Sequence, residues 1–255
     1  MTFINNIKFN ILSTQAGSLK PPIFKGERTQ LYPSTLEPSK DSFITNPMYN
    51  GFETQAEIEA VAKSNPRIME ILSKYNIPLK INMAELEKLK AGHMKDVRIN
   101  ASKIYSSLPQ ELKSEVNPSD LQQAAMLHDY GKLFIPEEIL NKPGALTQEE
   151  REIVEQHSEL GYELLKSKGV DEEVLELVKN HHRTANGGGY PVSDNTAGSD
   201  LGVQILRAAD IYSALTEQRV YKKAMTREDA LKTMYKDVES GKMSEEVYRA
   251  LEKAV

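Results

Sequence analysis

From Met83 onward, apolar residues recur three and four positions apart, which is the period of an amphipathic helix. No run of alternating apolar and polar residues competes with this pattern. We therefore predict an all-α fold, a bundle of helices. The stretches that carry the pattern are MAELEKLKAGHMKDVRINASKIYSSL, SDLQQAAMLHDYGKL, TQEEREIVEQHSELGYELLKSK, DEEVLELVKNHH, DLGVQILRAADIYSALTEQ, REDALKTMYKDVES and SEEVYRALEKA.

The segment before this region has a different composition. Residues 1–53 contain five prolines, between Pro21 and Pro47, among Asn, Ser and Thr, and no apolar period lasts two helical turns. We expect an irregular or disordered leader there. Residues 54–82 contain two shorter helical stretches divided at Asn65-Pro66, since proline disfavours helix in the residue before it. We expect them to pack on, or lead into, a domain that spans residues 83–255.

Several polar residues of the helical region stand in rows of apolar residues. A single inward histidine is more often a hydrogen-bonded core residue than a metal ligand. Several such groups buried together are costly unless a cation balances them, so we favour a metal site. The residues in question are His93, His128, His157 and Asp210.

The absence of cysteine limits the chemistry of such a site. It excludes disulfides, a thiolate zinc site and a cysteine nucleophile, and it suits the reducing cytoplasm. Imidazole and carboxylate groups are then the remaining strong ligands, and they suit Fe, Mn, Co, Ni or Zn.

Charge and hydropathy exclude two classes of partner. The formal charge of −5, from 32 basic and 37 acidic residues, argues against a broad basic surface for DNA or RNA, so a nucleotide partner should be small. No apolar run approaches the roughly 20 residues of a membrane-spanning helix, and residues 1–12 do not resemble a signal peptide. We expect a cytoplasmic protein with no membrane segment.

Two adjacent pairs sharpen the metal hypothesis. His128 and Asp129 are neighbouring helical positions about 100° apart, so the imidazole can bind one ion while the carboxylate reaches a second. His181 and His182 end a helix, where they could also simply favour the negative end of its dipole. The glycine-rich run at 186–189 follows that helix and not a strand, which argues against a Rossmann or P-loop site.

Taken together, these segments resemble the HD-GYP branch of the HD-domain metal-dependent phosphohydrolases. The likeness runs from about His93 to the C-terminus. What is known of that family implies a helical bundle that hydrolyses cyclic di-GMP to linear pGpG or GMP. The segments that carry the likeness are GHMKDVR, MLHDYGKLFIPEEILNKPGALTQEE, QHSELGYELL, NHHRTANGGGYP and ILRAADIYSALTEQRVYKKAMT.

The resemblance implies a role for each matching position. Two divalent ions are expected, with Fe or Mn favoured and Zn, Ni, Co or Mg also compatible, and Asp129 bridging them. Asp129 and Lys132 would be the catalytic residues, with Lys132 touching a substrate phosphate. One ion would be held by His93, His128, Asp129 and Asp210 and the other by His157, His181 and His182, and the remaining substrate contacts would come from Gly189, Tyr190, Arg219 and Lys222.

Four positions depart from the family pattern. Arg183 and Asn186 stand where the family usually has acidic residues, which bears on the choice of substrate. Leu89 occupies the position of a glutamate that binds a third metal in some members, so we expect two ions. Ser213 replaces a common aspartate near Asp210, which weakens an expected hydrogen bond beside the metals.

Three functions are compatible with these features. The first is a phosphoric diester hydrolase acting on a cyclic dinucleotide, because two cations can neutralise a phosphodiester and acidify a water. The second is an HD hydrolase acting on another nucleotide phosphoester. The third is a module that binds a cyclic dinucleotide without turnover, as a scaffold. A homodimer or a regulatory partner bound through the N-terminal region is also expected.

Overall fold

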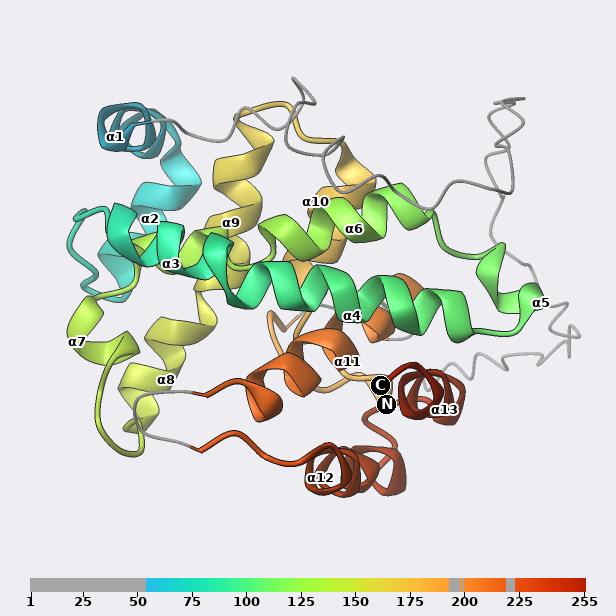
Figure 1. The fold of residues 1–255 in the computed structure, drawn as a ribbon. Helices are drawn as coiled ribbons and strands as arrows, with labels where there is room; N and C mark the ends of the chain where they lie inside the picture. The colour runs from blue at the N-terminus through green and yellow to red at the C-terminus, as the bar shows by residue number, and fades with distance from the viewer. Residues whose placement is uncertain (1–53, 193–197, 199, 219–222) are drawn as a thin grey trace, which may run out of the picture. The chain divides into compact units, whose positions relative to one another are not determined.

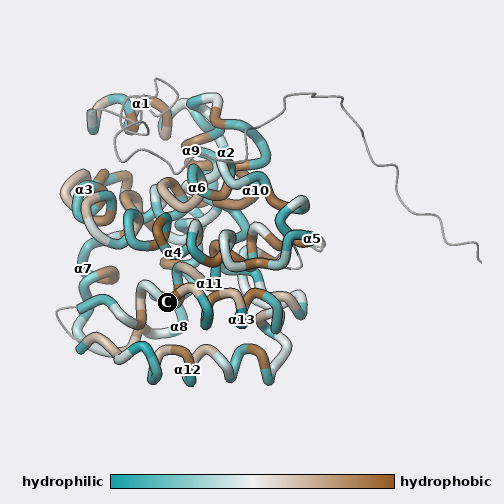
Figure 2. Tube along the Cα trace, turned by 45° about the vertical axis from the view of Figure 1, so that its right-hand side comes forward, coloured by the Kyte–Doolittle hydropathy of each residue, from teal (hydrophilic) through white to brown (hydrophobic). Residues whose placement is uncertain are grey.

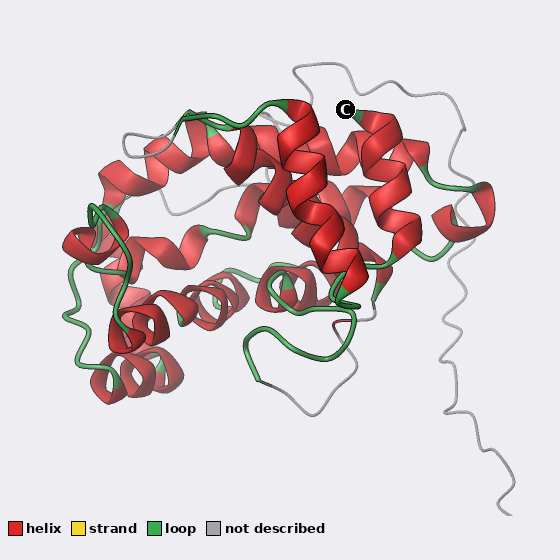
Figure 3. Cartoon of the chain, turned by 90° about the horizontal axis from the view of Figure 1, so that it is seen from below, coloured by secondary structure: helices red, strands yellow, loops and turns green. Residues whose placement is uncertain are grey.

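The computed structural model describes residues 54–192, 198, 200–218 and 223–255, and their regular structure is helical (Figure 1). Within these ranges the chain forms no β-strand, only an isolated bridge between Arg183 and Gly189 (Figure 3). The all-α prediction is confirmed. The elements are α1 Gln55–Ser64, α2 Pro66–Lys74, α3 Met83–Ala91, α4 His93–Ser107, α5 Gln110–Lys113, α6 Pro118–Leu127, the 3₁₀ helix η2 Tyr130–Phe134, α7 Glu137–Leu140, α8 Gln148–Glu155, α9 His157–Lys166, α10 Glu172–Asn180, α11 Leu201–Thr216, α12 Arg227–Glu239 and α13 Glu245–Ala254.

The leader predicted for residues 1–53 lies outside the described residues. The same holds for the homodimer or regulatory partner expected through the N-terminal region. Among the described residues, no helix is both long enough and apolar enough to cross a membrane.

Helix α4 lies among α3, α6, α11 and α13, and α9 packs against η2 and α10 (Figure 1). The helices turn their apolar sides toward one another, as the colouring of Figure 2 shows along α4, α6 and α11. This burial removes apolar surface from water and supplies the main favourable term in folding. The largest fully buried side chains belong to one continuous core and include Ile58, Met94, Ile104, Leu121, Phe134 and Leu160.

The two short helices at residues 54–82 form where the sequence places them. The side chain of Asn65 caps α2 by accepting hydrogen bonds from the backbone N–H groups of Arg67 and Ile68, at 2.9 and 3.1 Å. Its amide nitrogen also donates to Glu163 Oε2 on α9 at 3.1 Å, and Arg67 pairs with Glu159 of the same helix. Asn65-Pro66 is therefore both the predicted helix boundary and an attachment to α9.

Two of the predicted long helices are each divided in two. The stretch at 83–108 breaks at Gly92, whose φ of −116° and ψ of −94° are not helical. The stretch at 147–168 breaks after Gln156, whose backbone N–H bonds to Ile153 O and Val154 O. Apolar periodicity continues across both breaks, so the pattern alone does not reveal them. The residue after each break is a histidine, His93 or His157.

A close approach of two backbones fixes η2 against α9. A Cβ atom built on Gly131 would lie 1.8 Å from the backbone oxygen of His157 and 2.7 Å from the nitrogen of Gly161. Real Cβ atoms do not come that close to backbone, so only glycine fits at this point. The contact brings the segment with Asp129 and Lys132 against the first turn of α9.

We therefore expect Gly131→Ala to push η2 away from α9 and to lower the free energy of unfolding by at least about 1–3 kcal/mol, the usual cost of overpacking a core. Urea unfolding followed by circular dichroism measures this. Gly92→Ala is the matched control, because its Cβ would meet nothing closer than 3.6 Å. Equal stabilities of the two variants would contradict the account of this contact.

Candidate metal centre and its pocket

The expected metal ligands lie at the ends of helices. His93 and His157 are the first residues of α4 and α9, while His128 and His181 follow the last turns of α6 and α10 as their C-caps. Asp210 differs, since it lies within α11. The last turn of a helix has carbonyl oxygens with no partner inside the helix, and these are available to side chains that sit there.

Three of the histidines use such carbonyls in the same way. Each directs Nδ1 at the backbone oxygen three residues earlier: His128 at Ala125 O (2.9 Å), His157 at Val154 O (2.6 Å) and His181 at Val178 O (2.6 Å). A carbonyl oxygen only accepts hydrogen bonds, so Nδ1 carries the hydrogen when the ring is neutral. The lone pair of each ring is then on Nε2, the atom that is free to bind a metal.

One group of ligands gathers around Asp210 and His93. The Nε2 atom of His93 lies 2.9 Å from Asp210 Oδ1, and that of His128 lies 3.9 Å from the same oxygen. Asp129 Oδ2 is 3.4 Å from His128 Nε2 and 3.8 Å from His93 Nε2. All of these residues are buried, so two imidazoles and two carboxylates share one desolvated place.

Asp129 also faces the second group. Its other oxygen, Oδ1, is 3.6 Å from His157 Nε2 and has no hydrogen-bond partner. One carboxylate therefore presents one oxygen to each group, which is the arrangement a bridging ligand needs.

In the second group, ring nitrogens face one another. His157 Nε2 lies 3.3 Å from His181 Nε2 and 3.2 Å from His182 Nε2. Because Nδ1 carries the hydrogen in His157 and His181, their two Nε2 lone pairs point at each other. Such an approach is repulsive unless a cation or a proton lies between the nitrogens.

The donor set fits divalent metal ions. In each of two groups, ligand atoms from three residues lie within 4.8 Å of one another: His157 with His181 and His182, and His93 with His128 and Asp129. His128 Nε2 and Asp129 Oδ1 are buried without a hydrogen-bond partner, as expected for atoms that bind an ion. Nitrogen and carboxylate oxygen without thiolate suit Fe, Mn, Co, Ni and Zn.

Burial and neighbouring charges set the protonation of these groups. Burial lowers the pKa of His157 to about 4 and that of His181 to about 3, with Lys132 and His128 adding to the respective effects. Both rings are therefore neutral at pH 7, the form that binds metal. Burial alone would raise the pKa of Asp129, but Lys132 and His128 hold it well below its usual range. The carboxylate is ionised.

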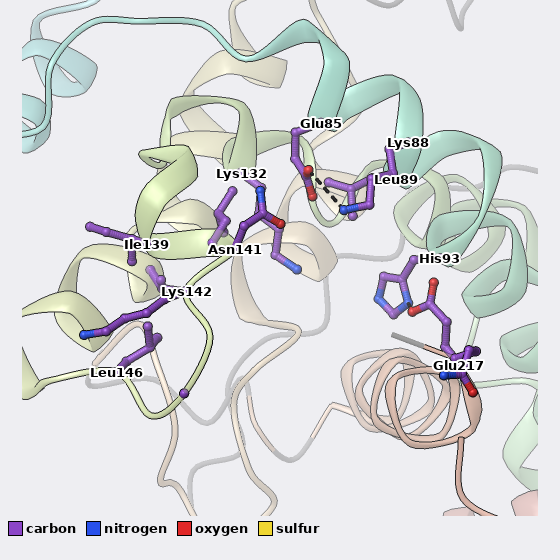
Figure 4. A pocket seen from close by; sticks show the side chains of 14 residues that line it. Glu85, Lys88, Leu89, His93, Lys132, Ile139, Asn141, Lys142, Leu146 and Glu217 are labelled. Atoms are coloured by element: carbon purple, nitrogen blue, oxygen red, sulfur yellow. Dashed lines mark hydrogen bonds and ion pairs between the residues drawn. The ribbon is translucent and has the colours of Figure 1, made fainter. Parts of the chain in front are cut away.

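Lys132 links the centre to a cavity. Its Nζ lies 2.7 Å from Asp129 Oδ2, and the side chain is one-fifth exposed. Lys132 and His93 both line a cavity of about 410 Å³ between α3, α7 and the loop after it, the last turn of α8 and the residues that follow α11. Figure 4 shows the wall of this pocket, with Lys142, Ile139 and Leu146 across from His93. A phosphate in the cavity could reach the ammonium group and the metal ligands together.

The loop with the glycines is held onto the second group. Tyr190 stacks on His182 with ring centroids 4.5 Å apart and an angle of 32° between the rings. Arg183 is buried and donates to the carbonyl oxygens of Gly189 and Pro191, at 3.5 and 3.2 Å. Asn186 donates to Ser240 O at 3.1 Å. Arg183 and Asn186, two departures from the family pattern, therefore both bind the loop to its own surroundings.

Ser213 and Leu89, the other two positions that differ from the family pattern, also have defined contacts. Ser213 accepts a hydrogen bond from the amide of Asn100 at 2.9 Å, so its hydroxyl joins α11 to α4. Leu89 is buried and lines the pocket as an apolar wall. Two of the expected substrate contacts, Arg219 and Lys222, lie outside the described residues.

Glu217 and Asn141 also line the pocket, and neither is among the functional residues expected from the sequence. Glu217 comes seven residues after Asp210, two turns along the same helix. That spacing places two carboxylates on one face, a signal that periodicity could have provided. Asn141 has no such signal, because it follows the four-residue helix α7.

Comparison with known proteins identifies the relatives. The HD-domain family model matches residues 78–247, more than half of the chain. The chain is 33% identical over 152 residues to 3′3′-cGAMP-specific phosphodiesterase 1 of Vibrio cholerae, a match that covers 58% of this chain and 35% of the relative. It is 39% identical over 128 residues to the cyclic di-GMP phosphodiesterase response regulator RpfG of Xanthomonas campestris, with 48% and 33% covered.

A third relative, a cyclic di-GMP phosphodiesterase of Thermotoga maritima, is 37% identical over 129 residues, with 50% of this chain and 34% of the relative covered. The matches thus span about a third of the length of each relative. HD-domain phosphohydrolases depend on metal ions, and the histidine and aspartate groups described above could bind them. This chain belongs to the HD-domain family, in its HD-GYP branch.

Proposed function

We propose that this chain is a metal-dependent phosphodiesterase that hydrolyses a cyclic dinucleotide, with cyclic di-GMP as substrate and pGpG or GMP as product. The observation that carries the proposal is the position of Asp129, which presents one carboxylate oxygen to each group of ligands beside a lysine that lines the cavity. The names of the relatives support this choice of substrate.

The chain would hold two divalent ions, Fe²⁺ or Mn²⁺ in the first instance. His93, His128, Asp129 and Asp210 would hold one, and His157, His181 and His182 the other, with Asp129 shared. When bound, the ions would neutralise the phosphate and make a water acidic enough to attack at neutral pH. Burial alone would raise the pKa of Asp210, but the contact with His93 and the nearby His128 hold it below its usual range, so Asp210 supplies a second fixed negative charge.

Lys132 would act on the substrate directly. In this structure its ammonium group pairs with Asp129, which keeps it within the centre and not in solvent. A phosphodiester gathers negative charge on its non-bridging oxygens as it is cleaved, and an ammonium group fixed beside them stabilises that charge. Gly189 and Tyr190 would contact the nucleotide from the loop that covers His182, and Arg219 and Lys222 would bind its far end.

A specific observation supports a second substrate. One relative is named a 3′3′-cGAMP-specific phosphodiesterase, and Arg183 and Asn186 of the loop depart from the family pattern. The assay should therefore contain 3′3′-cGAMP beside cyclic di-GMP. A module that binds either compound without cleaving it is the third outcome to distinguish.

The test is anaerobic purification and metal analysis, followed by incubation of the Fe²⁺- or Mn²⁺-loaded protein with each cyclic dinucleotide and chromatography of the products. We expect about two ions per chain and a linear product. Asp129→Ala should lose both metal and turnover, because it removes the carboxylate between the groups. Asp96→Ala, which removes an exposed carboxylate from the first turn of α4, is the control. Full activity of the Asp129 variant would refute this site.

Lys132→Met should separate metal binding from catalysis. The metal content should stay at the wild-type value, since lysine is not one of the ligands, while turnover falls by about 10²–10³-fold, as for the loss of one group that stabilises the transition state. Lys142→Met is the control: Lys142 lines the same pocket but is paired with Glu150. A loss of rate as large in the control would mean that general positive charge, and not the position of Lys132, is what matters.

The metal-free protein should lose stability on acidification. Below pH ~6.5 the unfolded chain takes up protons at His157 and His181, whereas the folded protein, with pKa values of about 4 and 3 for these rings, does not. Each ring thus lowers the free energy of unfolding by up to ~1.4 kcal/mol per pH unit between pH 6.5 and its folded pKa. His128 has a raised pKa, so its stabilising contribution grows as the pH falls toward 6.5 and opposes the loss there, but it adds nothing further once it is fully present at lower pH.

Urea unfolding in a chelator at pH 7 and pH 5.5 measures the effect. His181→Gln should reduce the difference between the two midpoints, because it removes one of the rings whose pKa is lowered by burial. A midpoint that is the same at both pH values would contradict the assignment of these rings as buried and neutral.

A further inference from the structure

His93 is anchored differently from the other histidines. In His128, His157 and His181, a carbonyl oxygen three residues earlier accepts from Nδ1 and so directs Nε2 toward the centre. His93 also follows the last turn of a helix, α3, but Gly92 between them is not helical, and no carbonyl oxygen of that turn is a partner of the ring. Its Nδ1 is buried and has no hydrogen-bond partner.

A side chain lies where that carbonyl would be. Glu217 Oε2 is 3.7 Å from His93 Nδ1, while Asp210 Oδ1 is 2.9 Å from Nε2 of the same ring. Both carboxylates come from α11, Asp210 from its body and Glu217 from its C-cap. One helix thus places a carboxylate at each nitrogen of one imidazole, and Figure 4 shows Glu217 beside the ring.

The N-terminus of α4 also stabilises the carboxylate of Glu217 in this position. Helix α4 has no side-chain cap, and its N-cap residue is Gly92. Glu217 Oε1 lies 3.8 Å from the point where a Cβ of Gly92 would be. A carboxylate at the N-terminus of a helix is stabilised by the backbone N–H groups there. The start of α4 therefore favours the place from which Glu217 faces His93.

We propose that Glu217 is the positioning residue of His93: it accepts the Nδ1 hydrogen and thereby fixes the tautomer whose Nε2 lone pair faces the first group of ligands. At 3.7 Å the two atoms are at ion-pair distance, and an approach of about half an ångström makes a hydrogen bond. Glu217 is one-third exposed at the end of its helix, so rotation about its side-chain bonds allows that approach. The inference rests on the proposed metal binding, and it concerns a residue that binds neither metal nor substrate.

The consequence is an asymmetry between the two metals. Without Glu217, the His93 ring can carry its hydrogen on either nitrogen, and the form with hydrogen on Nε2 cannot bind metal. A carboxylate that orients a metal-binding histidine typically raises metal affinity about 10–100-fold. The ion of the first group depends on this contact, whereas His157 and His181 keep their backbone carbonyls.

The test compares full-length wild type with Glu217→Ala, Glu217→Gln and Glu85→Ala, titrated with Mn²⁺ alone. We expect Glu217→Ala to weaken one of two Mn²⁺ sites about 10–100-fold and to leave the other unchanged. Glu217→Gln should restore most of the affinity, since its amide oxygen still accepts a hydrogen bond. Glu85 lines the same pocket and pairs with Lys88, so Glu85→Ala removes the same charge and should leave both sites unchanged.

Nitrogen-15 NMR of histidine-labelled protein loaded with diamagnetic Zn²⁺ gives a readout independent of activity. With Nε2 of His93 facing the ion, its Nδ1–H should show the shift and slow exchange of a hydrogen-bonded group in wild type and in Glu217→Gln, and should lose both in Glu217→Ala. Equal loss of Mn²⁺ affinity in the Ala and Gln variants, or equal effects of Glu217→Ala and Glu85→Ala, would overturn the inference by showing that charge alone acts. Two equally tight sites in Glu217→Ala would also overturn it, whereas a wild type that binds no Mn²⁺ would refute the proposed function itself.

Discussion

Five imidazoles and two carboxylates meet in one place from which water is largely excluded, and the free-energy cost of that burial constrains the rest of the structure. A buried polar group must have a partner, so each ring has to be fixed from outside the centre while its other nitrogen faces inward. The ends of helices meet this need, because their last carbonyls have no partner within the helix. The breaks after α3 and α8, and the ends of α6 and α10, therefore fall beside the histidines. The arrangement of helices follows from where those ends must meet.

The sequence predicts the helices well and their breaks poorly. The all-α class and the boundary at Asn65-Pro66 follow from local patterns, and the structure contains both. The interruptions at Gly92 and Gln156 cannot be predicted from local patterns, because apolar positions keep their spacing through both. Tertiary packing, which places His93 and His157 at the first position of a helix, determines these two breaks. Local helix propensity carries no information about it.

Residue types and spacing indicate the candidate ligands, but not how they are oriented. Apolar rows interrupted by His128, His157 and Asp210 already predict a buried polar cluster, and the fold brings these residues together. Which nitrogen of each ring faces inward depends on carbonyl oxygens three residues earlier, and this is visible only once the helix ends are known. The loop at Arg183 shows the same limit. Its sequence departs from the family, yet its side chain satisfies the carbonyls of Gly189 and Pro191, which no pattern in the sequence foretells.

The two groups of ligands differ in how much chain must be ordered before each exists. His157 and His182 are 25 residues apart, whereas His93 and Asp210 are 117 apart. The entropy lost on closing a loop grows with the logarithm of its length, so the longer closure costs about 1.4 kcal/mol more. The histidine trio is thus nearly a local structure of α9 and α10, while the other group is complete only when α11 is docked and supplies Asp210. Partial unfolding that releases α11 would take Asp210 from one half of the centre and leave the ligands of the other half in place.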